Sequence, residues 1–174
     1  DADGNNDLIL ANRDGGQNYI YLNDGKLGFD QKIAFGTGTD ETRSVAIADI
    51  NQDGIQDIIT ANIGEENVIY FGSTALDYSS SIVYDESKTG TYSLSTGDLD
   101  NDGDIDIVVA NSGSENKIFQ NDNNGAIWKL KMISKAKFNT YDILLKDING
   151  DGKLDIIEAN SDERNTFHLN TTKN

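Results

Sequence analysis

The chain has 174 residues, enough for one substantial core, and carries 30 acidic against 14 basic residues, a net charge of −16. This charge argues against nucleic acid or an anionic membrane as the main partner, because both bind basic surfaces. The chain has no cysteine, so disulfides make no contribution, and no stretch approaches the roughly 18 apolar residues of a membrane span.

The chain opens on the first of four copies of one acidic loop. The Asp before the loop glycine recurs as Asp3, Asp53, Asp102 and Asp151, a spacing of about 49 residues. A repeat of this length is typical of a propeller or a solenoid. We treat residues 1–174 as a single segment whose repeats span approximately residues 1–43, 44–91, 92–140 and 141–174.

Each loop is followed by a β-branched run that ends in Ala-Asn, which predicts a short strand. These runs are Leu8–Asn12, Ile58–Asn62, Ile107–Asn111 and Ile156–Asn160. After a polar turn, a second Asn opens another strand in every copy. These strands are Asn18–Leu22, Asn67–Phe71, Asn116–Phe119 and Asn165–Leu169. Asn at both ends of a tight connection indicates a turn, because its side chain bonds nearby backbone.

A third segment carries an aromatic residue after a turn rich in Gly, Asp and Asn, at Phe29, Tyr78 and Trp128. A fourth strand leads into the next acidic loop, and its small residues suit a crowded position near an axis. These strands are Val45–Ala48, Leu94–Gly97 and Ile143–Lys146. No segment shows a helical period. We therefore expect an all-β chain of four-stranded antiparallel propeller blades, with three, four, four and three strands, or about 3.5 blades.

The terminal blades are expected to be incomplete, because the first lacks an inner strand and the last lacks an outer strand. Unpaired strand edges recruit other strands, and natural proteins rarely leave them bare. We expect a neighbouring segment or a second protomer to complete both blades. The chain would then form part of a larger propeller, of seven blades or a similar number, or part of an assembly.

The acidic loop itself predicts a ligand. Oxygen-bearing side chains at positions 1, 3, 5 and 9, with a backbone carbonyl at position 7 and a glycine at position 6, suit a hard cation such as Ca²⁺. The expected ligands are Asp49, Asn51, Asp53, Ile55 (carbonyl) and Asp57 in the second copy, Asp98, Asp100, Asp102, Asp104 (carbonyl) and Asp106 in the third, and Asp147, Asn149, Asp151, Lys153 (carbonyl) and Asp155 in the fourth. The first copy lacks position 1 and offers Asp1, Asp3, Asn5 (carbonyl) and Asp7, so up to four ions are expected.

Three other interpretations of these loops are weaker. Asp-Gly and Asn-Gly also form ordinary hairpin turns, but four copies in register favour a metal site. An EF-hand would need a Glu at position 12 and flanking helices, whereas position 12 holds Thr60, Val109 and Glu158 and strands follow each loop. Magnesium prefers rigid octahedral sites that keep several waters, so calcium is the expected ion.

The pattern D-x-[DN]-x-D-G-x-x-D, followed by two apolar residues and then Ala-Asn, resembles the FG-GAP/VCBS repeats of integrin α-subunit-like β-propellers. The resemblance covers essentially the whole chain. It implies calcium in the hairpin between the first two strands of each blade, a propeller of usually seven blades, and an extracellular role in adhesion or in recognition of a protein or a glycan. The chain departs from the family in having fewer than four full blades and an incomplete first loop.

The sequence offers little catalytic chemistry, and we expect no enzymatic activity. There is no cysteine nucleophile and no recognisable serine elbow, and the single histidine, His168, lies in a predicted strand. The clustered carboxylates could in principle hydrolyse glycosides, but the metal accounts for them. The alternatives to a recognition segment are a structural subunit of an extracellular assembly or filament, or a part of a polysaccharide-degrading enzyme, catalytic or not.

Two further features bear on partners. The aromatic residues could form sugar platforms, but their repeated positions favour the core between blades; they are Tyr19, Tyr21, Tyr70, Phe71, Phe119, Trp128 and Phe167. Asn170-Thr171-Thr172 matches an N-glycosylation sequon, and a chance match is about as frequent as a modified site.

A partner is expected on the face opposite the calcium loops, at the variable turns after Asn12, Asn62, Asn111 and Asn160 and the connections 37–43, 85–91 and 134–140.

Overall fold

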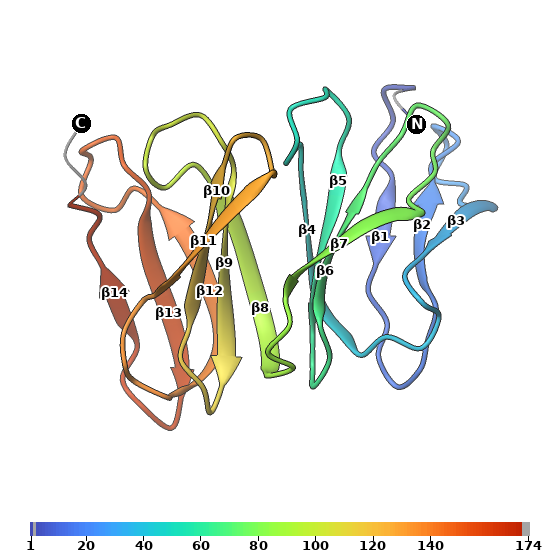
Figure 1. Ribbon diagram of the computed structural model, residues 1–174. Coiled ribbons are helices and arrows are strands. Elements are labelled where there is room, and N and C mark those ends of the chain that lie inside the picture. The colour runs from blue at the N-terminus through green and yellow to red at the C-terminus, as the bar shows by residue number, and fades with distance from the viewer. Residues whose placement is uncertain (2, 172–174) are drawn as a thin grey trace.

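The computed structural model of the chain describes residue 1 and residues 3–171 (Figure 1). These residues form fourteen β-strands and no helix, so the described part of the chain has no helix that could cross a membrane. The strands fall into successive groups of three, four, four and three, which we call blades 1 to 4. The all-β propeller-blade fold and the strand count expected from the repeat are confirmed.

The strands of the four blades have the following bounds. Blade 1 contains β1 (Leu8–Leu10), β2 (Asn18–Leu22) and β3 (Gln31–Phe35). Blade 2 contains β4 (Thr42–Ala48), β5 (Asp57–Asn62), β6 (Asn67–Phe71) and β7 (Ser80–Asp85). Blade 3 contains β8 (Gly90–Gly97), β9 (Asp106–Ser112), β10 (Lys117–Asp122) and β11 (Ile127–Met132). Blade 4 contains β12 (Asn139–Lys146), β13 (Asp155–Ser161) and β14 (Thr166–His168).

Strands that follow one another within a blade pair antiparallel, as expected of a propeller. Blades 1 and 2 are separate sheets, whereas blades 3 and 4 join into one sheet through the single residue pair Asn139–Ser112. An isolated bridge between Ile63 and Gly90 links blade 2 to blade 3 at the equivalent position. Blades 2 and 3, and likewise blades 3 and 4, therefore touch through their backbones at the start of β8 and β12.

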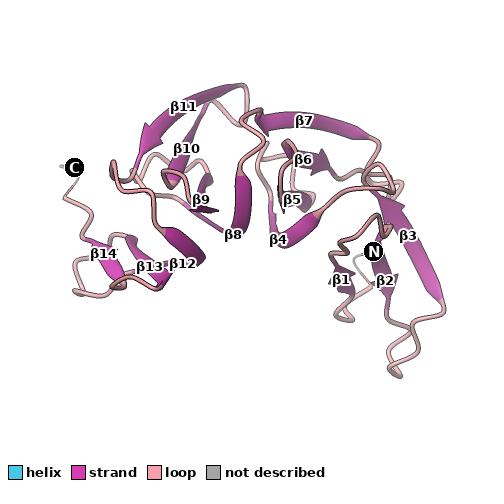
Figure 2. Cartoon of the chain, turned by 90° about the horizontal axis from the view of Figure 1, so that it is seen from below, coloured by secondary structure: helices cyan, strands magenta, loops and turns pink. Residues whose placement is uncertain are grey.

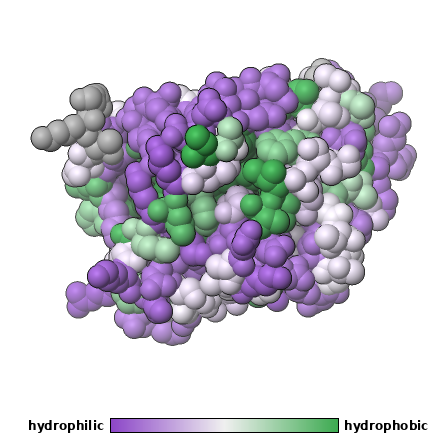
Figure 3. Space-filling view, in the orientation of Figure 1, coloured by the Kyte–Doolittle hydropathy of each residue, from purple (hydrophilic) through white to green (hydrophobic). Residues whose placement is uncertain are grey.

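The blades follow an arc, with β4, β8 and β12 on its concave side and β7 and β11 on its convex side (Figure 2). The inner strands share an irregularity near their start, where the pairing register shifts between Thr42 and Ser44, between Thr91 and Ser93, and between Thr140 and Asp142. The surface is polar at both ends of the blades, where the loops lie, and apolar residues gather between these ends (Figure 3).

The apolar core lies between the blades. Successive side chains of a strand point to opposite faces, and the second strand of a central blade is covered on both faces. Ile58 therefore packs between blades 1 and 2, while the next residue, Ile59, packs between blades 2 and 3. In the same way Ile107 and Val108 enter different clusters. Burial on both faces explains why these strands are continuously apolar in the sequence.

Four of the aromatic residues expected in the core occupy it. Tyr70 and Phe119 are buried, and Phe71 and Trp128 pack against the cluster between blades 2 and 3. Phe167 is 62% exposed, so the expectation is wrong for this residue. Its neighbours along β14 bond Glu158, which faces blade 3, and alternation puts Phe167 on the opposite face. Of the aromatics expected in the third segment, Trp128 alone lies within a strand, because Phe29 and Tyr78 precede β3 and β7.

The paired asparagines that the sequence suggested as turn residues also connect the blades. Within each copy the second Asn accepts a hydrogen bond from the backbone N–H of the first, as at Asn67 and Asn62 (2.7 Å). Its amide then donates to a threonine of the next inner strand. These bonds are Asn18–Thr42 (2.9 Å), Asn67–Thr91 (3.0 Å) and Asn116–Thr140 (2.8 Å). One buried polar bond thus fixes each blade against the next at the same height.

Candidate metal centre

The four acidic loops lie at one end of the blades, and the turns after the Ala-Asn pairs lie at the other (Figure 1). In loops 2 to 4 the acidic segment joins the inner strand of its blade to the second strand, so repeated blades bring the loops side by side. The loop glycine adopts a left-handed conformation, with φ of 85° at Gly54 and 96° at Gly103. Other residues rarely accept such a backbone, which is why glycine stands at this position.

The aspartate at position 1 orders the loop backbone. The carboxylate of Asp49 accepts hydrogen bonds from the backbone N–H groups of Asp53 (3.1 Å) and Gly54 (2.9 Å). Asp98 and Asp147 make the equivalent bonds in the third and fourth loops. Bonds from backbone N–H groups, first that of Gly152, lower the pKa of Asp147 below its ordinary value. In each of these loops the position-1 carboxylate is therefore held in place by the loop backbone.

The aspartate at position 9 is buried and connects the loop to the rest of the blade. Asp57 is fully buried, and its two oxygens accept hydrogen bonds from the N–H groups of Ile50 and Gly72, both at 2.9 Å. Asp106 and Asp155 make the same pair of bonds in their blades. A carboxylate has about four acceptor sites, so these bonds leave room for a cation. The sequence predicts the position-9 aspartate as a metal ligand but does not show that it also bonds the backbone of its blade.

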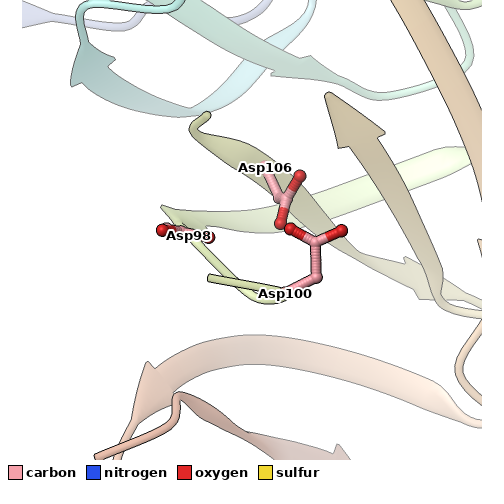
Figure 4. Close-up of side chains that lie close together, drawn as sticks. All are labelled: Asp98, Asp100 and Asp106. Carbon is pink, nitrogen blue, oxygen red and sulfur yellow. The ribbon is translucent and has the colours of Figure 1, made fainter. Parts of the chain in front are cut away.

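The third loop brings three carboxylates together. Asp98, Asp100 and Asp106 each place one oxygen within 4.8 Å of the others. The carboxylates of Asp100 and Asp106 face one another, with Asp98 beside them (Figure 4). Asp98 and Asp100 come from the loop, and Asp106 begins β9. This arrangement could hold a metal ion, because three negative groups converge on one point.

The electrostatics of the third loop show the cost of placing these groups together without a cation. Burial raises the pKa of Asp106 to about 6, although hydrogen bonds from Leu99 and Asn121 oppose the shift, and the charges of Asp100 and Asp102 raise it further. Burial, followed by the charge of Asp102, also raises the pKa of Asp100. A bound cation would reverse this effect, because an opposite charge favours the ionised form.

The residues present fit a hard divalent cation. Every donor in the cluster is a carboxylate oxygen, the ligand type that calcium prefers. The Oδ1 atom of Asp100 is buried and has no hydrogen-bond partner within the described residues. A buried acceptor without a partner costs about 1–3 kcal/mol, and coordination to a cation would remove that cost. The same loop therefore supplies both the donor set and an unsatisfied oxygen.

The other expected ligands are arranged as follows. In the second loop Asp49, Asp53 and Asp57 lie near enough that the charges of Asp53 and Asp49 raise the pKa of Asp57, after burial. In the second and fourth loops the position-3 asparagine donates a side-chain hydrogen bond to the position-5 aspartate, as Asn51 does to Asp53 and Asn149 to Asp151. The position-5 carboxylate accepts a hydrogen bond from the backbone N–H two residues later in loops 2 to 4, at Asp53, Asp102 and Asp151. The side chain of Asp104, expected to offer only its carbonyl, is buried and accepts bonds from Gln52 (2.8 Å) and Asn124 (3.2 Å).

The first loop differs from the others. The position-9 carboxylate of Asp7 accepts a hydrogen bond from the backbone N–H of Asn23 (2.9 Å). Asp3 accepts bonds from the backbone and the side chain of Asn5, which lower the pKa of Asp3. Within the described residues these carboxylates do not converge as those of the third loop do. Asn5 and Lys153, expected to offer backbone carbonyls, stay predictions.

Neighbouring loops are connected by residues that the sequence did not single out. The backbone N–H of Asn121 donates a hydrogen bond to the carboxylate of Asp106 (2.8 Å). The side-chain amide of Asn121 donates to the carbonyl of Ile50 in the second loop (3.1 Å). Gln52 also reaches from the second loop to the carbonyl of Gly103 in the third (3.0 Å). A displacement of one loop is therefore transmitted to the next. The repeated Asn at 121 and 170, 49 residues apart, was the available signal.

Asn170 plays the same part between the third and fourth loops. Its N–H donates to Asp155 (2.8 Å), and its side-chain amide donates to the carbonyl of Leu99 (2.6 Å). A glycan on Asn170 would replace a hydrogen of this amide, so the structure favours the chance interpretation of the sequon. Its third residue, Thr172, lies outside the described residues.

Without divalent metal, stability should fall as pH rises through about 6. The folded-state pKa of Asp106 lies about two units above its ordinary value of 3.8, so protonation favours the folded chain. This contribution is complete below about pH 3.8 and is lost as pH rises through about 6, which corresponds to about 3 kcal/mol. Urea unfolding in EDTA at several pH values measures it. The Asp106→Asn variant should have a flatter profile, and an equally steep one would contradict the assignment.

Comparison with known families adds one finding. A family model described as FG-GAP-like repeat matches residues 1–60 and 98–158. The matched segments include β1 to β4, the first two acidic loops and the start of β5, and then the third and fourth loops with β9 to β12 and the start of β13. A search of curated proteins found no match to the chain.

Proposed function

Because this chain belongs to the FG-GAP-like repeat family, we propose that it is a calcium-binding, non-catalytic propeller segment that recognises a protein or a glycan outside the cell. The observation that carries this proposal is the convergence of Asp98, Asp100 and Asp106 in a loop of oxygen donors. Calcium supplies positive charge to this end of the blades and neutralises carboxylates that otherwise repel one another.

Calcium at the loops would fix the blades as well as fill a site. The position-9 aspartate of each complete loop bonds the backbone of its own blade, and Asn121 and Asn170 continue from there to the preceding loop. A cation that draws the loop carboxylates together therefore also holds neighbouring blades in one arrangement. A rigid scaffold of this kind can present variable loops at its other end to a partner.

The proposed absence of catalysis rests on what the candidate catalytic groups do. His168, the single histidine, bonds Glu158 at 2.9 Å in β14. Glu158 is buried and also accepts a bond from Asn116 of blade 3 at 2.7 Å. Burial raises the pKa of Glu158, but its hydrogen bonds, first that from Asn116, outweigh burial and lower it. A carboxylate held ionised between two blades suits a structural role better than that of a general acid.

An extracellular location is proposed because FG-GAP-like repeats are typical of extracellular proteins. Calcium sites in extracellular modules have dissociation constants of about 10⁻⁴ to 10⁻³ M, and we expect this range for the acidic loops. Such sites would be filled at the millimolar calcium of the extracellular space and would be empty in the cytosol. Nanomolar or low micromolar affinity would contradict this location.

Isothermal titration of the metal-free chain with CaCl₂ tests the proposal. We expect binding with a dissociation constant of about 10⁻⁴ to 10⁻³ M. The Asp100→Asn variant, which keeps the side-chain shape and removes one charge, should weaken binding at the third loop. Asp122→Asn is the matched control, because Asp122 is paired with Lys129 at 2.6 Å and is not among the expected ligands. Absence of calcium binding to the wild-type chain would overturn the proposal.

A further inference from the structure

The three inner strands carry a stacked group of side chains at one equivalent position of the repeat. The rings of Tyr92 in β8 and Tyr141 in β12 lie 4.9 Å apart between centroids, tilted by 57°. The guanidinium carbon of Arg43 in β4 lies 5.9 Å from the centre of the Tyr92 ring, within the range of a cation–π interaction. We call these three residues the inner platform.

The backbone explains why these side chains lie together. Each is the residue at which the register of its inner strand shifts, one position after Thr42, Thr91 or Thr140. The residue at such an irregularity is left out of the pairing, and its side chain is directed away from the regular alternation. The preceding threonines are buried and bond the asparagines of the neighbouring blades. The platform is thus held by the bonds that fix the blades.

The platform is exposed and contains an unpaired cation. Tyr141 is 47% exposed and Tyr92 is partly buried, so the Tyr141 ring is accessible from solvent. Arg43 is exposed and forms no ion pair within the described residues, in a chain of net charge −16.

A carboxylate follows Tyr141 in the chain. Asp142 follows Tyr141, is exposed, and accepts hydrogen bonds from Ser93 (2.7 Å) and from its own strand through Oδ1. Its second oxygen accepts no bond within the described residues. The platform and Asp142 together offer aromatic faces, a guanidinium with five donors and a carboxylate acceptor. Aromatic faces pack against the apolar C–H face of a sugar ring, the guanidinium pairs with a sugar carboxylate, and Asp142 accepts hydrogen bonds from hydroxyl groups.

We propose that the inner platform binds a saccharide chain, with Tyr141 against a sugar ring and Arg43 on a carboxylate of a uronate unit. The proposal names a ligand class for the recognition role proposed above and rests on that role. The uronate follows from Arg43, because an unpaired guanidinium forms two parallel bonds with a carboxylate. The net charge of −16 does not prevent this contact, because exposed charges more than about 8 Å away are largely screened at physiological salt. The platform lies at the end of the inner strands remote from the acidic loops, about 20 Å away at the rise of a β-strand.

Binding of tetragalacturonate to the calcium-loaded chain, measured by titration calorimetry, tests the proposal. The Tyr141→Ala variant should bind at least about tenfold more weakly, and Tyr141→Phe should retain most of the affinity. Tyr19→Ala is the matched control, because Tyr19 also stacks with a cation, Lys32 at 4.0 Å, but belongs to β2. Equal loss in the Tyr19 and Tyr141 variants, or no binding to the wild-type chain, would overturn the proposal.

A neutral oligosaccharide of the same length, cellotetraose, tests the role of Arg43. The wild-type chain should prefer tetragalacturonate, and Arg43→Gln should remove that preference by weakening tetragalacturonate binding more than cellotetraose binding. Equal binding of both sugars by the wild-type chain would overturn the uronate assignment. Melting curves of the same variants with calcium and with EDTA distinguish the two proposals. A calcium-dependent melting temperature without sugar binding rejects the platform alone, and a melting temperature insensitive to calcium rejects the proposed function.

Discussion

Removal of calcium should lower the melting temperature of this chain by about 3–10 °C for each occupied loop. A ligand that binds only the folded state stabilises it by mass action, by about 1.4–2.7 kcal/mol at a concentration ten to one hundred times the dissociation constant. For a chain of 174 residues each kcal/mol shifts the melting temperature by about 2–4 °C. The comparison is made by scanning calorimetry in 10 mM CaCl₂ and in EDTA.

Two controls separate specific binding from general screening of charge. The net charge of −16 means that any salt reduces repulsion within the folded chain, so the EDTA sample must contain KCl at the same ionic strength. Magnesium at equal concentration should stabilise the chain less, because it gives up its water reluctantly. Equal melting temperatures in calcium, magnesium and potassium would show that the acidic loops are not calcium sites.

Substitution of Asp57 by alanine should destabilise the chain by about 2–6 kcal/mol, even when no metal is present. Both oxygens of this buried carboxylate accept backbone hydrogen bonds, from Ile50 and Gly72. Alanine would leave two buried N–H groups without partners, at about 1–3 kcal/mol each. Urea unfolding in EDTA measures the loss without any contribution from a lost metal ligand.

Asp53 provides the matched control in the same loop. Its exposed carboxylate accepts bonds from the backbone of Ile55 (2.8 Å) and from Asn51 (3.0 Å), and Asn at this position keeps an acceptor oxygen. In EDTA the Asp53→Asn variant should stay within about 0.5 kcal/mol of the wild-type chain, as most surface substitutions do. In calcium it should lose stability, because a charged ligand is gone. If Asp57→Ala were no less stable than Asp53→Asn in EDTA, Asp57 would have no structural role.

The local pattern of the sequence was sufficient to predict the blades. Strands such as Ile58–Asn62 and Asn67–Phe71 are recognised because apolar runs, polar turns and the acidic loop recur within each repeat. Every strand pairing within a blade joins strands adjacent in the chain. Propensity and spacing contain this information, so the fourteen strands and their grouping follow without coordinates.

The same local information identified the acidic loops, because their oxygen donors lie within nine consecutive positions. It did not show that Asp57 and Asp106 are buried and bonded to residues fifteen positions later, Gly72 and Asn121. Those bonds depend on how the third strand of the blade ends. A residue can match a ligand pattern and have a structural role as well, and only its surroundings distinguish the two.

By itself, the sequence determined the repeat, the strands and the oxygen-rich loops, because each depends on residues close together in the chain. The tertiary structure alone decided what lies between blades: Asn121 on the carbonyl of Ile50, 71 residues away, and Tyr92 against Tyr141. Those pairs depend on the distance and rotation between neighbouring blades. Packing of clusters contributed by several blades sets both quantities, and no short sequence window contains them.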